Sequence, residues 1–365
     1  MSVDATTRAP DPEGTPSVPG SAAADPAAGH QQSTTPDGPP RRSGAGALLA
    51  GSAGRNLGLV IALLLICLVG AFTAGDRFTS IDNAMTILRL AAVTGIVSVG
   101  MTFVIGGGGI DLSVGAIVAL ASVWATTLAT QAMAADVHWI VMVLVALAVG
   151  AGCGLVNGVL VAYGRVAPFI ATLAMLAGAR GLAEIIAQRR TQIVQDRDFI
   201  DFFQASVLGV PVLVIVFALV AVAGWVLLNR TTFGRRTLAV GGNPEAARLA
   251  GIKVQRHTAA LYVLLGVACG LAAVLLMART TTGTSTHGQL LELDAIAAVV
   301  IGGTLLSGGR ATIVGTVFGV LIFMTLTNVF TLNDLDTSTQ AVAKGLIIVA
   351  AVLLQQRVAA RRRSP

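Results

Sequence analysis

The chain has 365 residues, of which 55% are hydrophobic and only 12% are charged, and its formal net charge is +6. A soluble globular protein carries roughly 25% charged residues because its surface faces water. This composition therefore excludes an ordinary soluble domain and indicates a surface that faces lipid. The positive charges lie in the tails and in one central loop rather than on a single helix face, which argues against a nucleic-acid partner.

Residues 1–55 differ in composition from the rest of the chain. They are rich in Pro, Gly, Ala and Ser, as in residues 35–40, and they show no apolar periodicity. Such a segment cannot bury enough apolar surface to offset its conformational entropy. We expect a disordered cytoplasmic tail. We do not expect it to be a secretory signal, because the apolar run arrives too late.

From residue 57 onward, apolar runs of roughly 17 to 25 residues alternate with short polar breaks, and this is the length at which a helix crosses a bilayer. The 42 glycines fit close helix packing in lipid. The sequence therefore predicts an all-α, polytopic membrane helical bundle of about ten transmembrane helices over residues 56–356. The spans are expected near 57–74, 86–106, 112–133, 139–163, 168–187, 207–228, 258–278, 293–308, 312–331 and 340–356.

Three basic clusters predict the topology, because Lys and Arg favour the cytoplasmic side of membrane helices. One cluster precedes the first span, one lies in the central loop 229–256, and one forms the C-terminal tail 357–365. Six predicted spans lie before the loop and four after it, so all three clusters can share one side. Both termini are therefore predicted to be cytoplasmic.

A glycine-rich break precedes the third predicted span, where four glycines are followed by Ile110, Asp111, Leu112 and Ser113. Residues 302–310 form a similar break in the second half, and broken helices are common at transporter binding sites. A carboxylate is costly in lipid, so Asp111 is a candidate functional residue. Two interpretations stay open. Asp111 and Ser113 either line a substrate pathway or cap the following helix.

Further polar side chains fall inside predicted spans. Arg180 and Glu184 are four residues apart, so they share a helix face and are expected to form a pair. Asn157 either bonds to a neighbouring helix or faces the pathway. Lys344 is expected to extend its ammonium group toward the membrane surface.

Other polar residues lie near the ends of predicted spans. Glu292 and Asp294 are expected to cap the eighth span or to meet a delivering protein. His257 and His287 are expected to be solvated in loops.

The central loop carries strong local signals for a short helix. Asn243 suits an N-cap, Pro244 the first helical position, and Glu245 the positive end of the helix dipole. Gly251 suits a C-terminal stop. A helix of about two turns is marginal in water by itself. We therefore expect it to dock on a partner protein, although an amphipathic linker on the membrane surface is the alternative.

The run from Phe233 to Ile252, with its Gly241-Gly242-Asn243 segment, resembles the coupling loop of ATP-binding-cassette (ABC) import permeases. More narrowly it resembles the ribose/xylose/arabinose/galactose, or monosaccharide, branch. Other stretches that match are 109–115, 156–158 with 168–173, 180–182 and 292–298. The resemblance covers about residues 57–356.

The resemblance implies the permease subunit of an ATP-driven sugar importer in the bacterial cytoplasmic (inner) membrane, not an enzyme. The implied partners are an ABC-type ATPase subunit, an extracytoplasmic sugar-binding protein, a second permease copy (the same chain or a paralogue) and the lipid bilayer. The sequence has no Gly-x-x-x-x-Gly-Lys-Ser/Thr loop, so ATP is expected on the partner subunit, and no cofactor or metal is expected on this chain. The expected coupling residues are Gly234, Arg235, Asn243, Glu245, Ala246, Ala247 and Gly251, and the substrate-pathway candidates are Asp111, Ser113, Asn157 and Arg180.

Two other functions stay open. One is a branched-chain amino acid or nucleoside importer permease with the same coupling loop. The other is an ion-gradient-driven secondary transporter, in which Asp111 or Glu184 would couple the ion.

Overall fold

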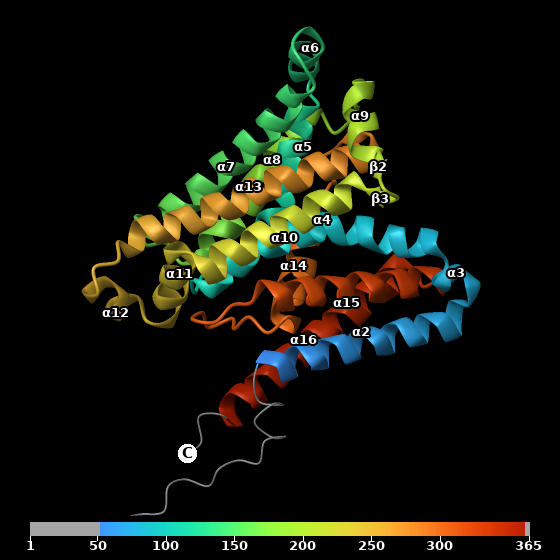
Figure 1. Cartoon of the computed structure of the whole chain (residues 1–365). Coiled ribbons are helices and arrows are strands. Elements are labelled where there is room, and N and C mark those ends of the chain that lie inside the picture. Colours follow the sequence, from blue (N-terminus) through green and yellow to red (C-terminus); the bar gives the residue numbers. More distant parts are fainter. Residues whose placement is uncertain (1–51, 362–365) are drawn as a thin grey trace, which may run out of the picture. The chain divides into compact units, whose positions relative to one another are not determined.

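The computed structural model describes residues 52–361, which form a bundle of α-helices with a few two-residue strands (Figure 1). The helices are α2 (Ser52–Ala74), α3 (Asp76–Thr79), α4 (Ile81–Gly106), α5 (Val114–Ala125), α6 (Leu128–Asp136), α7 (Ile140–Ala162), α8 (Pro168–Ala187), α9 (Arg197–Gln204), α10 (Val212–Arg230), α11 (Thr232–Gly242), α12 (Pro244–Leu249), α13 (Val254–Thr280), α14 (Leu291–Ile301), α15 (Ile313–Leu332) and α16 (Thr337–Arg361). Strand β1 (Gln192–Ile193) pairs antiparallel with β4 (Thr282–Gly283), and β2 (Ser206–Val207) pairs antiparallel with β3 (Val210–Pro211).

Seven helices in the described part of the chain are long and apolar enough to cross a bilayer, namely α2, α4, α7, α8, α10, α13 and α15. The bent pair α5 and α6, which turns by 57° at a short break, makes an eighth if it is taken as one span. The all-α, polytopic prediction is confirmed, and the chain is a multi-pass membrane protein. Ten continuous spanning helices are not confirmed.

Two predicted spans are broken helices. The predicted span 112–133 contains α5, with 12 residues, and the predicted span 293–308 contains α14, with 11 residues. Each is ~17 Å long, about half the hydrocarbon thickness. Helix α14 ends at Ile301 because Gly303 has a φ of +90°, a conformation that glycine adopts readily. The predicted end of this span at residue 308 is therefore wrong, whereas the glycine-rich break predicted at 302–310 lies where the helix ends.

The helices at both ends of the described region extend into predicted tails. Helix α2 begins at Ser52 and α16 continues through Arg361, so helix covers residues 52–55 and 357–361. The predicted disorder of residues 1–51 lies outside the described residues, as do residues 362–365 of the predicted C-terminal tail.

Helix α13 lies at the centre of the bundle and packs against α4, α5 and α7 (Figure 1). Glycines bring α7 and α13 into backbone contact. A Cβ atom on Gly150 would overlap the carbonyl oxygen of Gly266, and one on Gly154 would overlap that of Tyr262. Burial of apolar surface cannot drive helix association in lipid, so this close approach of small residues stabilises the pair.

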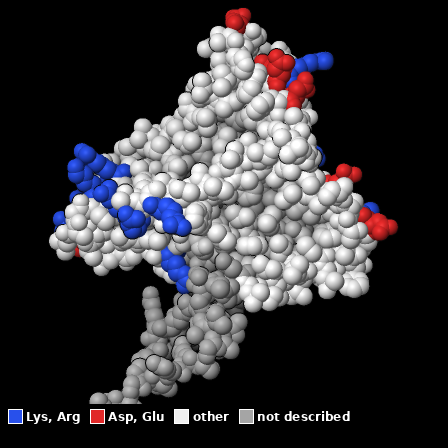
Figure 2. Space-filling view, in the orientation of Figure 1, with Lys and Arg blue, Asp and Glu red and all other residues white. Residues whose placement is uncertain are grey.

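The charged side chains separate to two ends of the bundle. Figure 2 shows most visible Lys and Arg gathered over α11 and α12, most visible Asp and Glu at the opposite end, and an uncharged surface between them. Helix α13 connects the two ends, since its 27 residues measure ~40 Å and exceed the ~30 Å hydrocarbon core. We call the end with α11 and α12 the basic end, and the end with α3, α6 and α9 the acidic end.

Candidate functional site

Helix α12 is short, and both of its ends are satisfied by hydrogen bonds. Asn243 Oδ1 accepts from the backbone N–H groups of Glu245 at 3.1 Å and Ala246 at 3.0 Å. At the other end, Gly251 has a φ of +82°, and the N–H of Ile252 donates to the carbonyl of Ala247 at 3.0 Å. The predicted start at Asn243 and stop at Gly251 are confirmed as helix caps.

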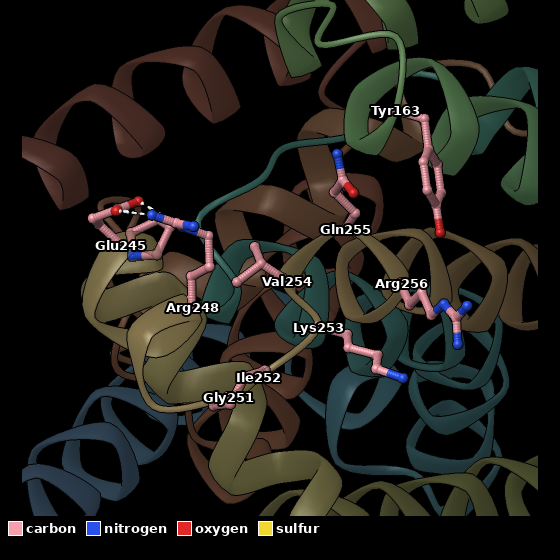
Figure 3. Close-up of a pocket in the computed structure, with 10 residues that line it drawn as sticks. Tyr163, Glu245, Arg248, Gly251, Ile252, Lys253, Val254, Gln255 and Arg256 are labelled. Atoms are coloured by element: carbon pink, nitrogen blue, oxygen red, sulfur yellow. Dashed lines mark hydrogen bonds and ion pairs between the residues drawn. The ribbon is translucent and has the colours of Figure 1, made fainter.

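Glu245 and Arg248 form an ion pair on the exposed side of α12 (Figure 3). Arg248 Nε donates to Glu245 Oε2 at 3.2 Å. This hydrogen bond and the charge of Arg248 lower the pKa of Glu245 from its ordinary value. A groove of about 750 Å³ lies beside the pair, between α12, the start of α13 and Tyr163, and it is lined by the basic residues Lys253 and Arg256.

Apolar side chains on α12 also face outward. Ala246 and Ala250 are exposed, and Leu249 is 76% exposed. Ala247 is buried instead, so its side chain packs toward the bundle. Leu249 was not among the predicted coupling residues, although an apolar side chain on so short a helix between two polar caps is a signal for a contact surface.

Helix α11 anchors α12 to the bundle. Gly234 packs so closely on Leu228 that a Cβ atom would overlap the carbonyl oxygen of Leu228. Thr237 Oγ1 lies 2.9 Å from His257 Nε2 on α13, and the rings of His257 and Phe233 are 4.7 Å apart. The prediction that His257 is solvated is therefore wrong, because α11 covers it. Arg235, on the same helix, is exposed.

Three glycine segments meet beside α11, and we call this contact the glycine junction (Gly106, Gly108, Gly241, Gly308 and Gly309). The N–H of Gly309 donates to the carbonyl oxygen of Gly106 at 3.0 Å. A Cβ atom on Gly241 would overlap the same Gly106 oxygen, and one on Gly308 would lie 2.9 Å from Gly108 Cα. The junction thus joins α11 to both breaks, the one that precedes α5 and the one that follows α14. The two glycine-rich breaks of the sequence lie in contact here.

Asp111, Ser113 and Asn157 form one buried polar cluster, which we call the Asp111 cluster. Asp111 Oδ1 accepts from the Ser113 N–H at 2.7 Å and from Ser113 Oγ at 2.6 Å. Asn157 Nδ2, on α7, donates to Asp111 Oδ2 at 3.2 Å and to Ser113 Oγ at 2.9 Å. The structure therefore brings these three pathway candidates together, and each of the three residues is at most 1% exposed.

The cluster confirms that Asn157 bonds to a neighbouring segment, whereas the role of these residues in a substrate pathway stays a prediction. Asp111 accepts a hydrogen bond from the N–H of Ser113, the residue that precedes α5. Asn157, on α7, donates to Asp111 from a different helix. Asn157 Oδ1, which is also buried, has no hydrogen-bond partner among the described residues. A buried acceptor without a partner is costly, so this oxygen favours a donor from outside the described residues.

Arg180, the fourth pathway candidate, lies apart from the Asp111 cluster. Its Nη1 donates to the carbonyl oxygens of Ser285 and of His287, the latter at 2.8 Å. Glu184 pairs with the exposed Arg189 at 3.5 Å. The predicted Arg180–Glu184 pair is therefore wrong, because the segment 281–290 lies within reach of the guanidinium.

The segment 281–290 leads into α14 along α5. His287 Nδ1 lies 3.1 Å from Ser122 Oγ of α5, and a Cβ atom on Gly288 would lie 2.7 Å from the Gly115 carbonyl oxygen. His287 is therefore buried rather than solvated. The polar segment ahead of α14 thus packs along α5, the helix in the other broken span.

Lys344 on α16 forms an ion pair with Asp294. Its ammonium nitrogen lies 3.3 Å from Asp294 Oδ2 in the first turn of α14 and 5.2 Å from the centre of the Phe323 ring. Asp294 is therefore a partner of α16 rather than a cap of its own helix. Across residues 52–361, no group of three or more His, Cys, Asp or Glu side chains is arranged to hold a metal ion.

Known proteins resemble this chain along most of its length. Residues 83–352 match the family described as branched-chain amino acid transport system / permease component. The ribose import permease protein RbsC of Bacillus subtilis (strain 168) is 42% identical over 309 residues, which are 84% of this chain and 93% of that protein. RbsC of Escherichia coli (strain K12) is 39% identical over 303 residues, 82% of this chain and 92% of that protein.

A relative named for a different sugar is nearly as similar. The L-arabinose ABC transporter permease protein AraH of Azospirillum brasilense is 36% identical over 308 residues, 84% of this chain and 89% of that protein. No solved structure matches the chain. The family match and the near-complete coverage of these relatives together show that this chain belongs to the ABC import permease family, in the branch that contains the ribose and arabinose permeases.

Proposed function

We propose that the chain is the permease subunit of an ATP-driven monosaccharide importer. It would couple ATP hydrolysis on a partner ATPase subunit to the inward movement of a sugar. The observation that carries this proposal is the glycine junction, which links the exposed α11–α12 unit to both broken spans. A partner that moves α12 would therefore move the breaks next to α5 and α14.

Helix α12 has the properties of a docking element. It presents Leu249 and the Glu245–Arg248 pair to solvent, while the groove beside it is lined by Lys253 and Arg256. An apolar anchor with charged neighbours suits a protein partner better than a lipid surface, because a carboxylate such as Glu245 is unfavourable next to anionic headgroups. The ATPase subunit would bind here, as the resemblance of residues 233–252 implies.

The charge distribution supports an orientation with the basic end in the cytoplasm. The basic end carries α11 and α12, and basic residues favour the cytoplasmic side of a bacterial inner membrane. The ATPase would then dock from the cytoplasm, and a sugar-binding protein would deliver substrate at the acidic end. A second permease copy, either the same chain or a paralogue, would complete the pathway.

The Asp111 cluster is the proposed contact for the sugar within the pathway. It joins a carboxylate, a hydroxyl and an amide whose Oδ1 has no described partner. Sugar hydroxyl groups can donate to such oxygens. Arg180 would act separately by holding the segment 281–290 in place through its two backbone carbonyls.

A monosaccharide is favoured over a branched-chain amino acid as the substrate. The family description names branched-chain amino acids, but the RbsC and AraH relatives described above, which are 36–42% identical, are named for ribose and arabinose. The clustered donors and acceptors around Asp111 also suit hydroxyl groups better than an aliphatic side chain. Which monosaccharide is carried would depend largely on the binding protein.

Uptake of labelled ribose and arabinose into proteoliposomes tests this proposal. The vesicles would contain the permease and its ATPase subunit, with the binding protein added outside and ATP trapped inside. We expect uptake that requires ATP and the binding protein and that persists after ionophores remove proton and sodium gradients. Uptake that stops with the gradients while ATP remains would favour a secondary transporter, and leucine uptake without sugar uptake would favour the amino acid importer.

A further inference from the structure

A second cavity, of about 250 Å³, opens at the acidic end and is lined by two arginines. We call it the two-arginine cavity. Its walls are Arg89 of α4, Gln204 of α9, Pro211 of β3, Leu213 in the first turn of α10 and Arg279 near the end of α13. Arg279 lies next to the last residue of the ~40 Å helix α13, so this cavity is far from α12.

The two arginines have no carboxylate partner among the described residues. The ion pairs among the described residues join Arg189 to Glu184, Arg248 to Glu245 and Lys344 to Asp294, and none of them includes Arg89 or Arg279. Gln204 uses its amide nitrogen to donate to the carbonyl of Ala278 at 2.7 Å. The cavity therefore holds two guanidinium groups that no described acidic side chain neutralises.

The remaining walls of the cavity suit an anion that is bonded to an apolar group. Leu213 is in the first turn of α10, a 19-residue helix whose start has no side-chain cap, so the positive end of the helix dipole borders the cavity. Pro211 and Leu213 are themselves buried and give the cavity an apolar side. An anionic group next to hydrocarbon fits both features.

The depth of Arg89 identifies the source of that anion. Arg89 is exposed, lies between Leu88 and Leu90, and follows the first residue of α4 by about two turns, or ~12 Å. Helix α4 has 26 residues and is ~39 Å long, so it exceeds the ~30 Å hydrocarbon core by several ångströms at each end. In a bilayer centred on α4, the Arg89 backbone would lie just inside the hydrocarbon, within reach of the lipid phosphates through its long side chain.

We propose that the two-arginine cavity binds the headgroup phosphate of a membrane lipid in the leaflet at the acidic end. A guanidinium group donates two parallel hydrogen bonds to phosphate oxygens, and two such groups would hold one phosphate firmly. Pro211 and Leu213 would contact the glycerol and the first methylene groups. Because the site carries two positive charges, it prefers an anionic lipid such as phosphatidylglycerol over zwitterionic phosphatidylcholine.

Native mass spectrometry of the purified full chain in mild detergent, with phosphatidylglycerol titrated in, tests the proposal. Arg89→Gln and Arg279→Gln should each weaken lipid binding about tenfold, since each removes a charge-assisted contact. Arg77→Gln is the matched control, because Arg77 is exposed at the acidic end but does not line the cavity. Wild-type affinity in the Arg89→Gln/Arg279→Gln variant, or equal weakening by Arg77→Gln, would overturn the proposal.

Two further measurements make the result specific. Millimolar inorganic phosphate should leave the bound lipid in place, and displacement would identify the cavity as a site for the free ion and overturn the lipid assignment. Thermal unfolding in the same detergent checks that each variant is folded. If a glutamine variant fails this check, Arg89→Lys and Arg279→Lys replace it, and they should bind the lipid more weakly than wild type because lysine cannot form the bidentate contact.

Discussion

The backbone N–H of Gly309 donates a hydrogen bond of 3.0 Å to the carbonyl oxygen of Gly106. The two residues are far apart in the sequence and belong to the two breaks that interrupt the spanning helices. Gly241 of α11 packs against both of them. Because a side chain on Gly241 would separate these backbones, the contact between α11 and the two broken spans depends on glycine at position 241.

Replacing Gly241 with Ala should weaken the glycine junction. The new methyl group would overlap the Gly106 carbonyl oxygen and press on the Gly309 N–H, so we expect a loss of about 1–3 kcal/mol in unfolding free energy and reduced transport. Gly242→Ala is the control, because its Cβ atom would lie 3.8 Å from the nearest atom, Gly309 Cα. Thermal unfolding in detergent compares the two, and equal stability of both variants would rule out the close packing described here.

Replacing Asn157 with Ala should leave the Asp111 cluster unsatisfied. Asp111 Oδ2 would lose its bond to Asn157 Nδ2 inside the bundle, which should cost about 1–3 kcal/mol. Sugar uptake should also fall if the amide contacts the substrate. Asn229→Ala removes an exposed bond to the Trp225 carbonyl within one helix and should change neither stability nor uptake measurably. Unchanged unfolding of Asn157→Ala would contradict the burial of the cluster.

The Lys344–Asp294 pair should stabilise the attachment of α16 to α14. Lys344→Met leaves the mostly buried Asp294 carboxylate without its cation, so we expect a loss of about 2–4 kcal/mol. Adding Asp294→Leu should recover part of that loss, because both charges are then gone. The exposed Arg189–Glu184 pair provides the comparison, since Arg189→Gln should cost less than about 1 kcal/mol. A double-mutant cycle without coupling between Lys344 and Asp294 would show that the pair does not form.

Leu249 should act as an apolar anchor for the ATPase subunit. Leu249→Ala removes exposed apolar surface that the partner would bury, and we expect about tenfold weaker ATPase binding. Leu208→Ala serves as the control, because Leu208 is 99% exposed but lies between β2 and β3 at the acidic end. Binding of the purified ATPase to immobilised permease measures both variants. Equal affinities for the two variants would remove Leu249 from the interface.

The caps of α12 were predictable from the sequence because they depend on local chemistry. Asn243 and Pro244 favour a helix start, and Gly251 favours a stop through its positive φ. The membrane bundle was equally predictable, because an apolar run long enough to cross a bilayer indicates a membrane-spanning helix. The proximity of Asp111 and Ser113 followed from their spacing, whereas the bond to Asn157 on another helix did not.

The errors arose where partners are distant in the sequence. Lys344 has no carboxylate close to it on α16, so only the fold identifies Asp294 as its partner. Arg180 has a carboxylate one turn away, yet it bonds to carbonyl oxygens of the segment 281–290. The glycine-rich break at 302–310 was visible in the sequence, but hydropathy alone placed the end of the span at residue 308, because glycine is neither strongly apolar nor polar.

The proposed coupling of the permease to its ATPase through α12 is tested most directly by exchange of the Glu245 and Arg248 charges. The variant Glu245→Arg/Arg248→Glu can keep the ion pair while reversing the charges that a partner meets, at a cost to the helix of less than about 1 kcal/mol from the dipole. The measurement is ATP-driven sugar uptake together with co-purification of the ATPase subunit from mild detergent. We predict a folded, membrane-inserted permease that loses both uptake and the ATPase. Normal uptake with normal recovery of the ATPase would contradict the assignment of α12 as the coupling helix.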